Sequence, residues 1–471
     1  MAATVVCILC AIVILKPQEF TPILSGVPIV HILFVLCVGA GVLDVLQGKT
    51  RLSFAPHVAL TGAFFAWAAV VTFVRSPQTF FAEMGALIIE LGLFAVIAFF
   101  PASVHGVQRV CGTYLLAALF AASVAIMQAS GPLGCMQAAA DDWEGREGVE
   151  FDGRACETSI DCRKDPPVLN ANYRCEHLGP LGTSTIGGRV RYRGTLADPN
   201  DLSLATALAL PFLIAFSERQ TPASKSKRRN DSFDFLQLSK TLAMIAAIAV
   251  VGTMIVLSQS RMGVLVFIIV LGLAFLRRAG MWGVIWGLIF LPPVLFWGGR
   301  AGGDADASSK ERLDLLAEAL SMIRQSHGIG VGMGRFADES STGLTAHNSY
   351  LLVAAELGLV GVALFCLILY SAIKVPVSLW LGHDELEPEL KRWSSALAIG
   401  FVGAYVGIFF LSWAYKEILY IMFGLSAALH QVARQTHPHV RIALSAREVT
   451  LVVGFALTFV PLMYALVRIV G

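Results

Sequence analysis

The chain has 471 residues, of which 56% are apolar and only 14% are charged, against roughly 45–50% and about 25% in an ordinary soluble domain. With a mean hydropathy of +0.70, this composition excludes a soluble globular enzyme and indicates a polytopic membrane protein. The formal net charge of +2 gives no sign of nucleic-acid binding or of a general attraction to anionic surfaces.

Apolar segments long enough to cross a bilayer recur along the whole chain. The first, residues 2–15, is interpreted as a membrane helix and not as a signal peptide, because no basic residue precedes it and no small-residue cleavage site follows it. The pattern predicts an all-α polytopic membrane protein with about 12 to 13 transmembrane helices and two long loops. The thirteen candidate spans are 2–15, 27–46, 57–74, 84–100, 110–129, 201–217, 241–257, 262–276, 281–297, 348–373, 394–413, 417–430 and 449–468.

The distribution of basic residues predicts the orientation in the membrane. With a cytoplasmic N-terminus, the cytoplasmic loops hold seventeen Lys and Arg residues and the short loops on the opposite side hold four, as the positive-inside rule requires. Two long hydrophilic segments then lie outside the cytoplasm, and the basic segment 218–240 lies inside. The expected divisions are N-terminal helices 1–129, an extracytoplasmic loop 130–200, central helices 201–297, a second extracytoplasmic loop 298–347 and C-terminal helices 348–471.

Four of the nine cysteines, Cys135, Cys156, Cys162 and Cys175, lie together in the first long loop. An even number of cysteines in an extracytoplasmic loop predicts two disulfides, and the sequence leaves three connectivities open. A zinc site is the alternative, but no C-x-x-C pair is present and only His177 could add an imidazole. We therefore expect disulfides and no metal.

The second long loop contains a predicted amphipathic helix and a glycine-rich turn. Ser308 and Glu311 have the spacing of a capping box, and apolar residues follow at helical spacing up to Ser326. The glycines of GIGVGMG (328–334) match no nucleotide-binding signature and predict a close-packed turn at the membrane surface.

Polar residues beside the membrane mark candidate sites, because burial in lipid penalises them unless structure or function requires them. Arg189, Arg191 and Arg193 alternate just before a span, which in an extended segment puts three guanidiniums on one edge, where a phosphate could bind. The alternative is that they pair with carboxylates of their own loop. Arg261, at the junction of two spans, is either an interfacial anchor or an anion ligand.

The segment TAHNSYLLVAAELGLVG marks a third place. His347, Asn348 and Tyr350 stand at the start of a predicted span, and Glu356 lies well inside it. Histidine is the side chain best suited to take a proton near neutral pH. Asn348 or Ser349 could instead serve only to cap the helix.

These stretches resemble the O-antigen ligase and polymerase superfamily, whose members act on glycans linked to undecaprenyl diphosphate. The resemblance rests on RGTLADPNDL (193–202), SQSRMG (258–263), GIGVGMGRF (328–336) and AHNSYLLVAAELGLVG (346–361), which follow in the family's order. It covers roughly 190 to 365, while the remaining spans match in hydropathy and count. The 130–190 insert with its cysteines resembles a lineage-specific addition.

The resemblance implies a GT-C-like, multi-pass protein of the bacterial cytoplasmic membrane and an inverting, metal-independent glycosyl transfer without a cofactor. The donor is then an undecaprenyl-diphosphate glycan on the extracytoplasmic face, and the acceptor is a glycan or lipid, with a polysaccharide-assembly complex as a further partner. His347 matches the family's catalytic histidine and Arg261 its membrane-edge arginine, while Arg191 and Arg193 both remain candidates for a second arginine. The further substrate-binding candidates are Arg189, Asn200, Asn348, Tyr350 and Glu356.

Several functions remain open at this point. The acceptor decides between a polysaccharide polymerase, a lipid A core ligase and a protein O-oligosaccharyltransferase. A membrane solute transporter of the bicarbonate type is a further alternative, with Asp44, Glu90 and Glu356 as its ionisable candidates within spans. A non-catalytic scaffold would tolerate substitution of Arg261 and His347.

Overall fold

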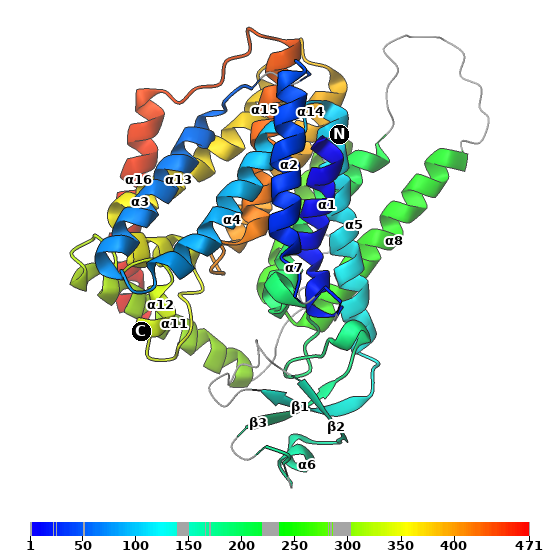
Figure 1. Cartoon of the computed structure of the whole chain (residues 1–471), viewed down its shortest axis with the longest axis vertical. Helices are drawn as coiled ribbons and strands as arrows, with labels where there is room; N and C mark the ends of the chain where they lie inside the picture. The colour runs from blue at the N-terminus through cyan, green and yellow to red at the C-terminus, as the bar shows by residue number, and fades with distance from the viewer. Residues whose placement is uncertain are drawn as a thin grey trace.

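The computed structural model is a bundle of long helices with a small sheet at one end (Figure 1). The sheet, two helices of the second long loop and the C-terminus lie at this end, and the N-terminus lies at the opposite one. The predicted span 281–297, apart from residues 282 and 285, and the basic residues between 219 and 229 fall outside the described part of the chain. The described residues are 2–21, 23–24, 26–49, 52–138, 150–164, 166–168, 171–218, 235–280, 282, 285 and 303–470.

Most of the predicted apolar spans form helices. The helices are α1 (Ala2–Leu15), α2 (Ile29–Leu46), α3 (Pro56–Arg75), α4 (Phe80–Phe99), α5 (Val104–Gln128), α6 (Ser159–Arg163), α7 (Pro199–Ser217), α8 (Phe235–Ser258), α9 (Arg261–Ala279), α11 (Gly303–Gln325), α12 (Arg335–Glu339), α13 (Ser349–Leu381), α14 (Pro388–Gly407), α15 (Glu417–Thr436) and α16 (Ala446–Val470). Three short 3-10 turns lie at Pro17–Glu19, Pro180–Gly182 and Gly194–Leu196.

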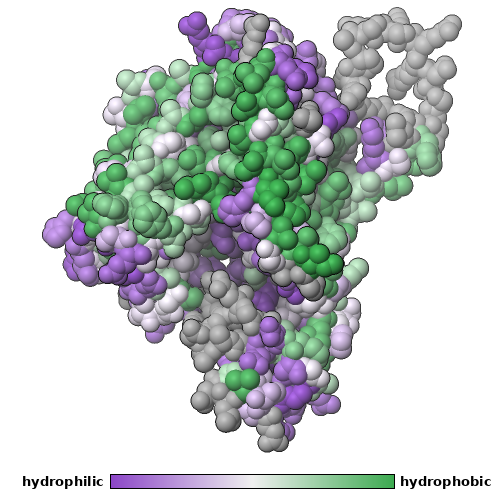
Figure 2. Space-filling view, viewed as in Figure 1, coloured by the Kyte–Doolittle hydropathy of each residue, from purple (hydrophilic) through white to green (hydrophobic). Residues whose placement is uncertain are grey.

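Nine helices of the described chain are long and apolar enough to cross a membrane. They are α2, α3, α4, α5, α7, α8, α9, α13 and α16, although the last residue of α16 and the first two of α8 fall outside the candidate span. Apolar side chains cover the middle of the visible face along α2 and α4, while hydrophilic residues gather at both ends (Figure 2). The prediction of an all-α polytopic membrane protein is confirmed.

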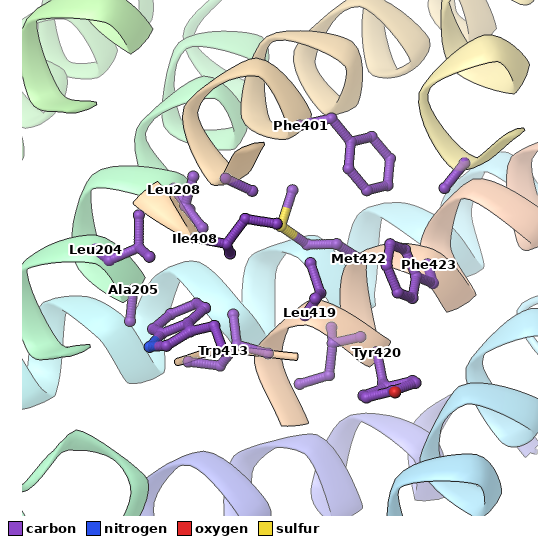
Figure 3. Close-up of a cluster of buried hydrophobic side chains, with 14 of the residues drawn as sticks. Leu204, Ala205, Leu208, Phe401, Ile408, Trp413, Leu419, Tyr420, Met422 and Phe423 are labelled. Atoms are coloured by element: carbon purple, nitrogen blue, oxygen red, sulfur yellow. The ribbon is translucent and has the colours of Figure 1, made fainter. Parts of the chain in front are cut away.

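Helix α7 lies in the centre of the bundle, where 83% of its most apolar stretch is buried. Its Leu204 and Leu208 point into a cluster that α14, α15 and the connection between them complete (Figure 3). The absence of a side chain at Gly407 of α14 leaves room for Leu204, and Gly403 does the same beside Leu208. This close approach fixes α7 against α14.

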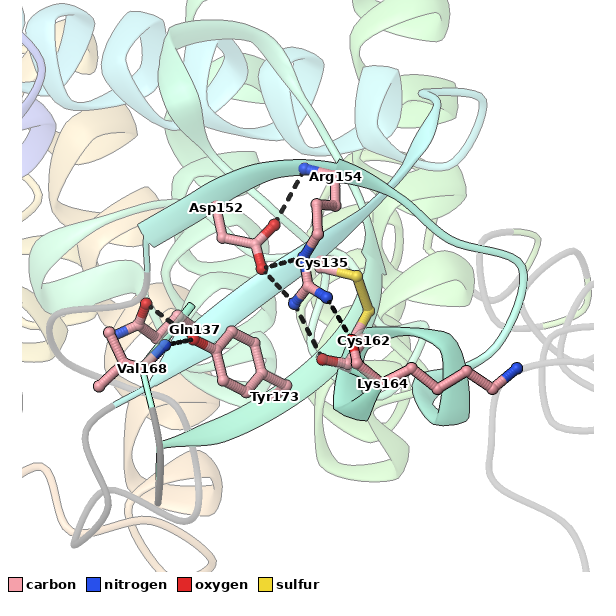
Figure 4. Close-up of polar contacts among 8 residues, drawn as sticks. All are labelled: Cys135, Gln137, Asp152, Arg154, Cys162, Lys164, Val168 and Tyr173. Carbon is pink, nitrogen blue, oxygen red and sulfur yellow. Dashed lines mark hydrogen bonds and ion pairs between the residues drawn. A yellow bond between two sulfur atoms is a disulfide. The ribbon is translucent and has the colours of Figure 1, made fainter. Parts of the chain in front are cut away.

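The first long loop contains a three-stranded antiparallel sheet that hydropathy did not predict. The strands β1 (Leu133–Ala138), β2 (Glu150–Ala155) and β3 (Asn172–His177) pair in the order β2-β1-β3. Cys135 is bonded to Cys162 and Cys156 to Cys175. Arg154 adds a polar link, because it binds the Asp152 carboxylate and donates to the carbonyls of Cys162 and Lys164 at the end of α6 (Figure 4).

Peptide mapping under non-reducing conditions is expected to recover these two pairs and no other combination of the four cysteines. A small polar module cannot bury enough apolar surface to hold itself together, so the cross-links supply its order. Replacing both Cys156 and Cys175 by serine should cost about 2–5 kcal/mol of module stability, measured as faster proteolysis within 150–177. A peptide joining Cys135 to Cys156, or four free thiols, would contradict the pairing.

The predicted amphipathic helix of the second loop is present, but its start is wrong. Helix α11 begins at Gly303, so Ser308 lies within the helix and does not cap it. Its apolar side is buried through Leu315, Ala319 and Ile323. The helix therefore packs by its apolar stripe, as predicted. It includes residues 303–307 and so begins about one turn earlier than predicted.

Candidate functional site

Three helices of the bundle begin with a side-chain cap next to the segments that sequence analysis singled out. Asp198 accepts from the backbone N–H of Asn200 at 2.6 Å at the start of α7. Ser260 caps α9 through Gly263, and Asn348 caps α13 through the N–H of Leu351 at 2.9 Å. Asn348, and not Ser349, is therefore the cap of α13. Each helix start carries a partial positive charge that favours an anion.

Hydrogen bonds between these helix starts bring them to one place. The Trp413 indole donates to Asp201 in the first turn of α7 at 2.7 Å, and the Trp413 backbone N–H donates to Ser349 Oγ in the first turn of α13 at 2.7 Å. Ser203 of α7 shares a hydrogen bond of 2.7 Å with Ser258, which lies two residues before the cap of α9. The three positive helix ends therefore meet in one region.

The arginine segment crosses this region. Arg189 is 8% exposed, and its guanidinium donates to the Ser258 carbonyl at 2.8 Å and to the Asn200 side chain at 3.1 Å. The N–H of Val190 donates to the Leu257 carbonyl. Arg189 thus lies against the residues that lead directly into Arg261, the exposed first residue of α9. Sequence analysis placed Arg189 only among the further substrate-binding candidates.

The other two arginines of the segment contact different elements. Arg191 is buried, and its Nε donates to the Ser184 carbonyl at 3.0 Å. Arg193 donates to the carbonyls of Glu19 and Gly182. The structure therefore gathers Arg189 and Asn200 with the SQSR segment and directs Arg193 toward the turn after α1.

His347 lies at the end of the second loop, immediately before the cap of α13. Its backbone has a φ of 48°, a left-handed conformation that is uncommon for residues other than glycine and that concentrates at functional sites. Its neighbours are fixed, since Asn348 Nδ2 donates to the Phe409 carbonyl at 2.9 Å and the Ser349 N–H donates to the Ile408 carbonyl at 2.9 Å. The imidazole is half-buried, beside the region where α7 and α13 begin.

The glycine-rich turn and the later ELG sequence form one structural unit. Helix α13 is broken at Gly358, where φ is 70° and ψ is −168°. The N–H of Val331 donates to the Ala355 carbonyl at 3.0 Å, and the N–H of Leu359 donates to the Gly328 carbonyl at 2.9 Å. Because the turn supplies the hydrogen bonds that the helix lacks at the break, it anchors the second loop to α13.

Two further sequence candidates, Glu356 and Tyr350, make internal contacts of the bundle. Glu356 is buried, and its carboxylate accepts from the Phe336 N–H at 3.2 Å on the glycine-turn side. The Tyr350 ring packs among phenylalanines, including Phe365 and Phe409. The structure does not bring these two side chains to the arginines.

Sequence analysis missed the connection between α14 and α15. Lys416 lies 3.4 Å from the Asp201 carboxylate, and Trp413 binds the same carboxylate. Burial lowers the pKa of the Lys416 ammonium, but the carboxylates of Asp201 and Glu417 outweigh it and the net shift is upward. The only sequence signal was a few polar residues between two apolar spans.

A cavity and a group of cysteines lie elsewhere in the described chain. A cavity of about 620 Å³ lies between α11 and the loop at Ser341. The sulfur atoms of Cys135, Cys156 and Cys162 lie within 4.8 Å of one another, but each is bonded to another sulfur. The grouping is therefore the two disulfides, and its sulfurs are not thiolates available to zinc.

Comparison with known proteins supports the resemblance found in the sequence. A search of curated proteins found no match for the chain. Residues 245–366 match the family model described as O-antigen ligase. The match includes Arg261, the glycine-rich turn, His347 and the broken part of α13. The chain is therefore a polytopic membrane protein with a region, residues 245–366, that is similar to the O-antigen ligase family.

Proposed function

We propose that the protein transfers or polymerises glycan from an undecaprenyl-diphosphate donor on the extracytoplasmic face of the bacterial cytoplasmic membrane. The observation that carries the proposal is the meeting of three helix starts with Arg189 and the residues leading into Arg261. Positive helix ends and guanidiniums are the groups that bind a diphosphate. The proposed orientation, with a cytoplasmic N-terminus, puts this region outside the cytoplasm.

The proposed reaction needs two kinds of group. An acceptor hydroxyl attacks the anomeric carbon of the donor sugar, and the bond from that carbon to the diphosphate oxygen breaks with inversion. Arg261 and one of Arg191 or Arg193, with Arg189 beside the segment that leads into Arg261, stabilise the charge on the leaving diphosphate. The hydroxyl proton passes to a ring nitrogen of His347. No metal or cofactor has a part in this scheme.

Gene deletion followed by analysis of surface polysaccharide tests the proposal and identifies the acceptor. Retention of single repeats with loss of long chains indicates a polymerase. Accumulation of intact lipid-linked chains indicates a ligase, and loss of glycan from pilin-like proteins indicates a protein glycan transferase. Unchanged polysaccharide and unchanged glycoproteins would contradict all three forms of the proposal.

Replacing Arg261 by lysine is expected to lower transfer at least about tenfold, although the charge is kept. The planar guanidinium can hold two phosphate oxygens at once, whereas an ammonium is a point charge, and a hydrogen bond to a charged group is worth about 1.5–3 kcal/mol. The measurement is complementation of the deletion strain at equal membrane levels. Arg324→Lys, on the exposed face of α11, is the matched control and should leave transfer unchanged. Full activity of Arg261→Lys would remove Arg261 from diphosphate binding.

A further inference from the structure

A buried carboxylate joins the disulfide-bonded module to the arginine segment. Glu176 lies in β3 next to Cys175 and is only 5% exposed. Its carboxylate accepts from Thr185 Oγ1 at 2.6 Å, from the N–H of Gly187 at 2.6 Å and from the N–H of Gly188 at 3.2 Å. Three donors therefore converge on one carboxylate, and all three precede Arg189 in the chain.

The donors belong to a tight turn. Ile186 and Arg189 exchange backbone hydrogen bonds of 2.9 and 3.1 Å across it. The two central residues, Gly187 and Gly188, have φ values of 56° and 73°, which is the pattern of a two-residue hairpin turn with both central residues left-handed. The carboxylate holds the two central N–H groups and so fixes this turn.

This hairpin turn fixes the position of the arginine segment that follows it. Arg189 is its last residue, and the guanidinium of Arg189 contacts Ser258 and Asn200 beside the starts of α9 and α7. A second tie runs through Thr185, whose Oγ1 also accepts from the N–H of His177 in the module at 2.9 Å. The module therefore holds the arginine segment from the side opposite the helix ends.

We propose that Glu176 is a positioning residue, which sets Arg189 against the helix starts and makes donor binding depend on the disulfide-bonded module. The inference rests on the proposed function, because it concerns the same diphosphate. Glu176 itself acts through the turn and does not touch the substrate. Loss of its carboxylate frees the turn and lets the guanidinium shift, and a shift of about 1 Å is enough to weaken binding strongly.

The test uses the purified full chain and two measurements: binding of undecaprenyl diphosphate, and the KM and kcat of transfer from the lipid-linked glycan. Glu176→Gln places an amide where a carboxylate accepts three hydrogen bonds, so the Kd and the donor KM should rise at least about tenfold. The kcat should fall as well, because the guanidinium that shifts belongs to the groups that stabilise the leaving diphosphate. Glu157→Gln, an exposed glutamate of the same module, should match the wild type.

Thr185→Val is the second variant, for the case in which Glu176→Gln does not fold. It removes one of the three donors and should raise the donor Kd and KM by a few fold. A merely structural role would lower the amount of folded protein and leave the Kd of the folded fraction unchanged, which would overturn the inference. If the wild type binds undecaprenyl diphosphate but transfers no glycan, the proposed function fails. The difference in Kd between the wild type and Glu176→Gln still decides the role of Glu176 in that case.

Discussion

Alanine in place of His347 is expected to slow glycan transfer by roughly 10²–10⁴-fold, the range for removal of a general base. His347 has a left-handed backbone conformation directly before the Asn348 cap, and the two residues that follow it are bonded to the carbonyls of Phe409 and Ile408. Because the imidazole is only half-buried, its removal should leave helix packing and the membrane level of the protein intact. Donor KM should change little, since the arginines remain.

His105→Ala is the matched control for this variant. His105 is exposed in the first turn of α5, at the end of the bundle opposite the proposed site, and its removal should leave transfer unchanged. Assembly of polysaccharide by the His347→Ala strain at a near-normal rate, with equal protein in the membrane, would exclude His347 as the base.

Alanine in place of Gly358 is expected to abolish stable folding of the protein. The backbone at Gly358 has a φ of 70° and a ψ of −168°, and strain of this kind costs about 1–3 kcal/mol in a residue with a side chain. A Cβ there would also overlap the carbonyl oxygens of Gly328 and Ile329, which are backbone atoms that no rotamer change can move. The glycine-rich turn would then separate from α13, and the loop that ends at His347 would lose its anchor.

The measurement is thermal unfolding in detergent, followed as loss of the monodisperse peak in size-exclusion chromatography. Gly272→Ala is the control, because nothing lies within 4 Å of a Cβ at this position of α9 and its φ is not positive; this variant should be as stable as the wild type or slightly more so. Equal melting temperatures for the two variants would contradict the broken-helix packing.

The transmembrane part of the fold could be predicted because lipid imposes one strong constraint, namely that each span is a long apolar helix. The break at Gly358 could not, since the sequence on both sides of it is as apolar as a continuous helix. The start of α11 was placed too late, at Ser308, because a capping-box pattern can also occur within a helix. The three strands were missed because the polar insert shows little alternation and its sheet depends on the disulfides.

Some residues of the candidate site follow from local sequence patterns, and others follow only from contacts between distant segments. Arg261 and His347 are proposed from local motifs, whose residues lie close together in the sequence. The bridge from Trp413 to Asp201 spans 212 residues, and no local pattern reports a contact at that separation. The same reason kept Arg189 out of the catalytic set, because its contact with Ser258 depends on how the loop returns to the end of α8.

Reconstitution of the purified protein with an undecaprenyl-diphosphate glycan and an acceptor glycan tests the central claim most directly. The expected result is a product with an inverted linkage at the donor's anomeric carbon and release of undecaprenyl diphosphate in equal amount. Both should form at least about tenfold more slowly in Arg261→Lys and more slowly still in His347→Ala. Movement of a small solute such as bicarbonate into sealed vesicles, with the lipid-linked glycan unconsumed, would contradict the account and indicate a transporter.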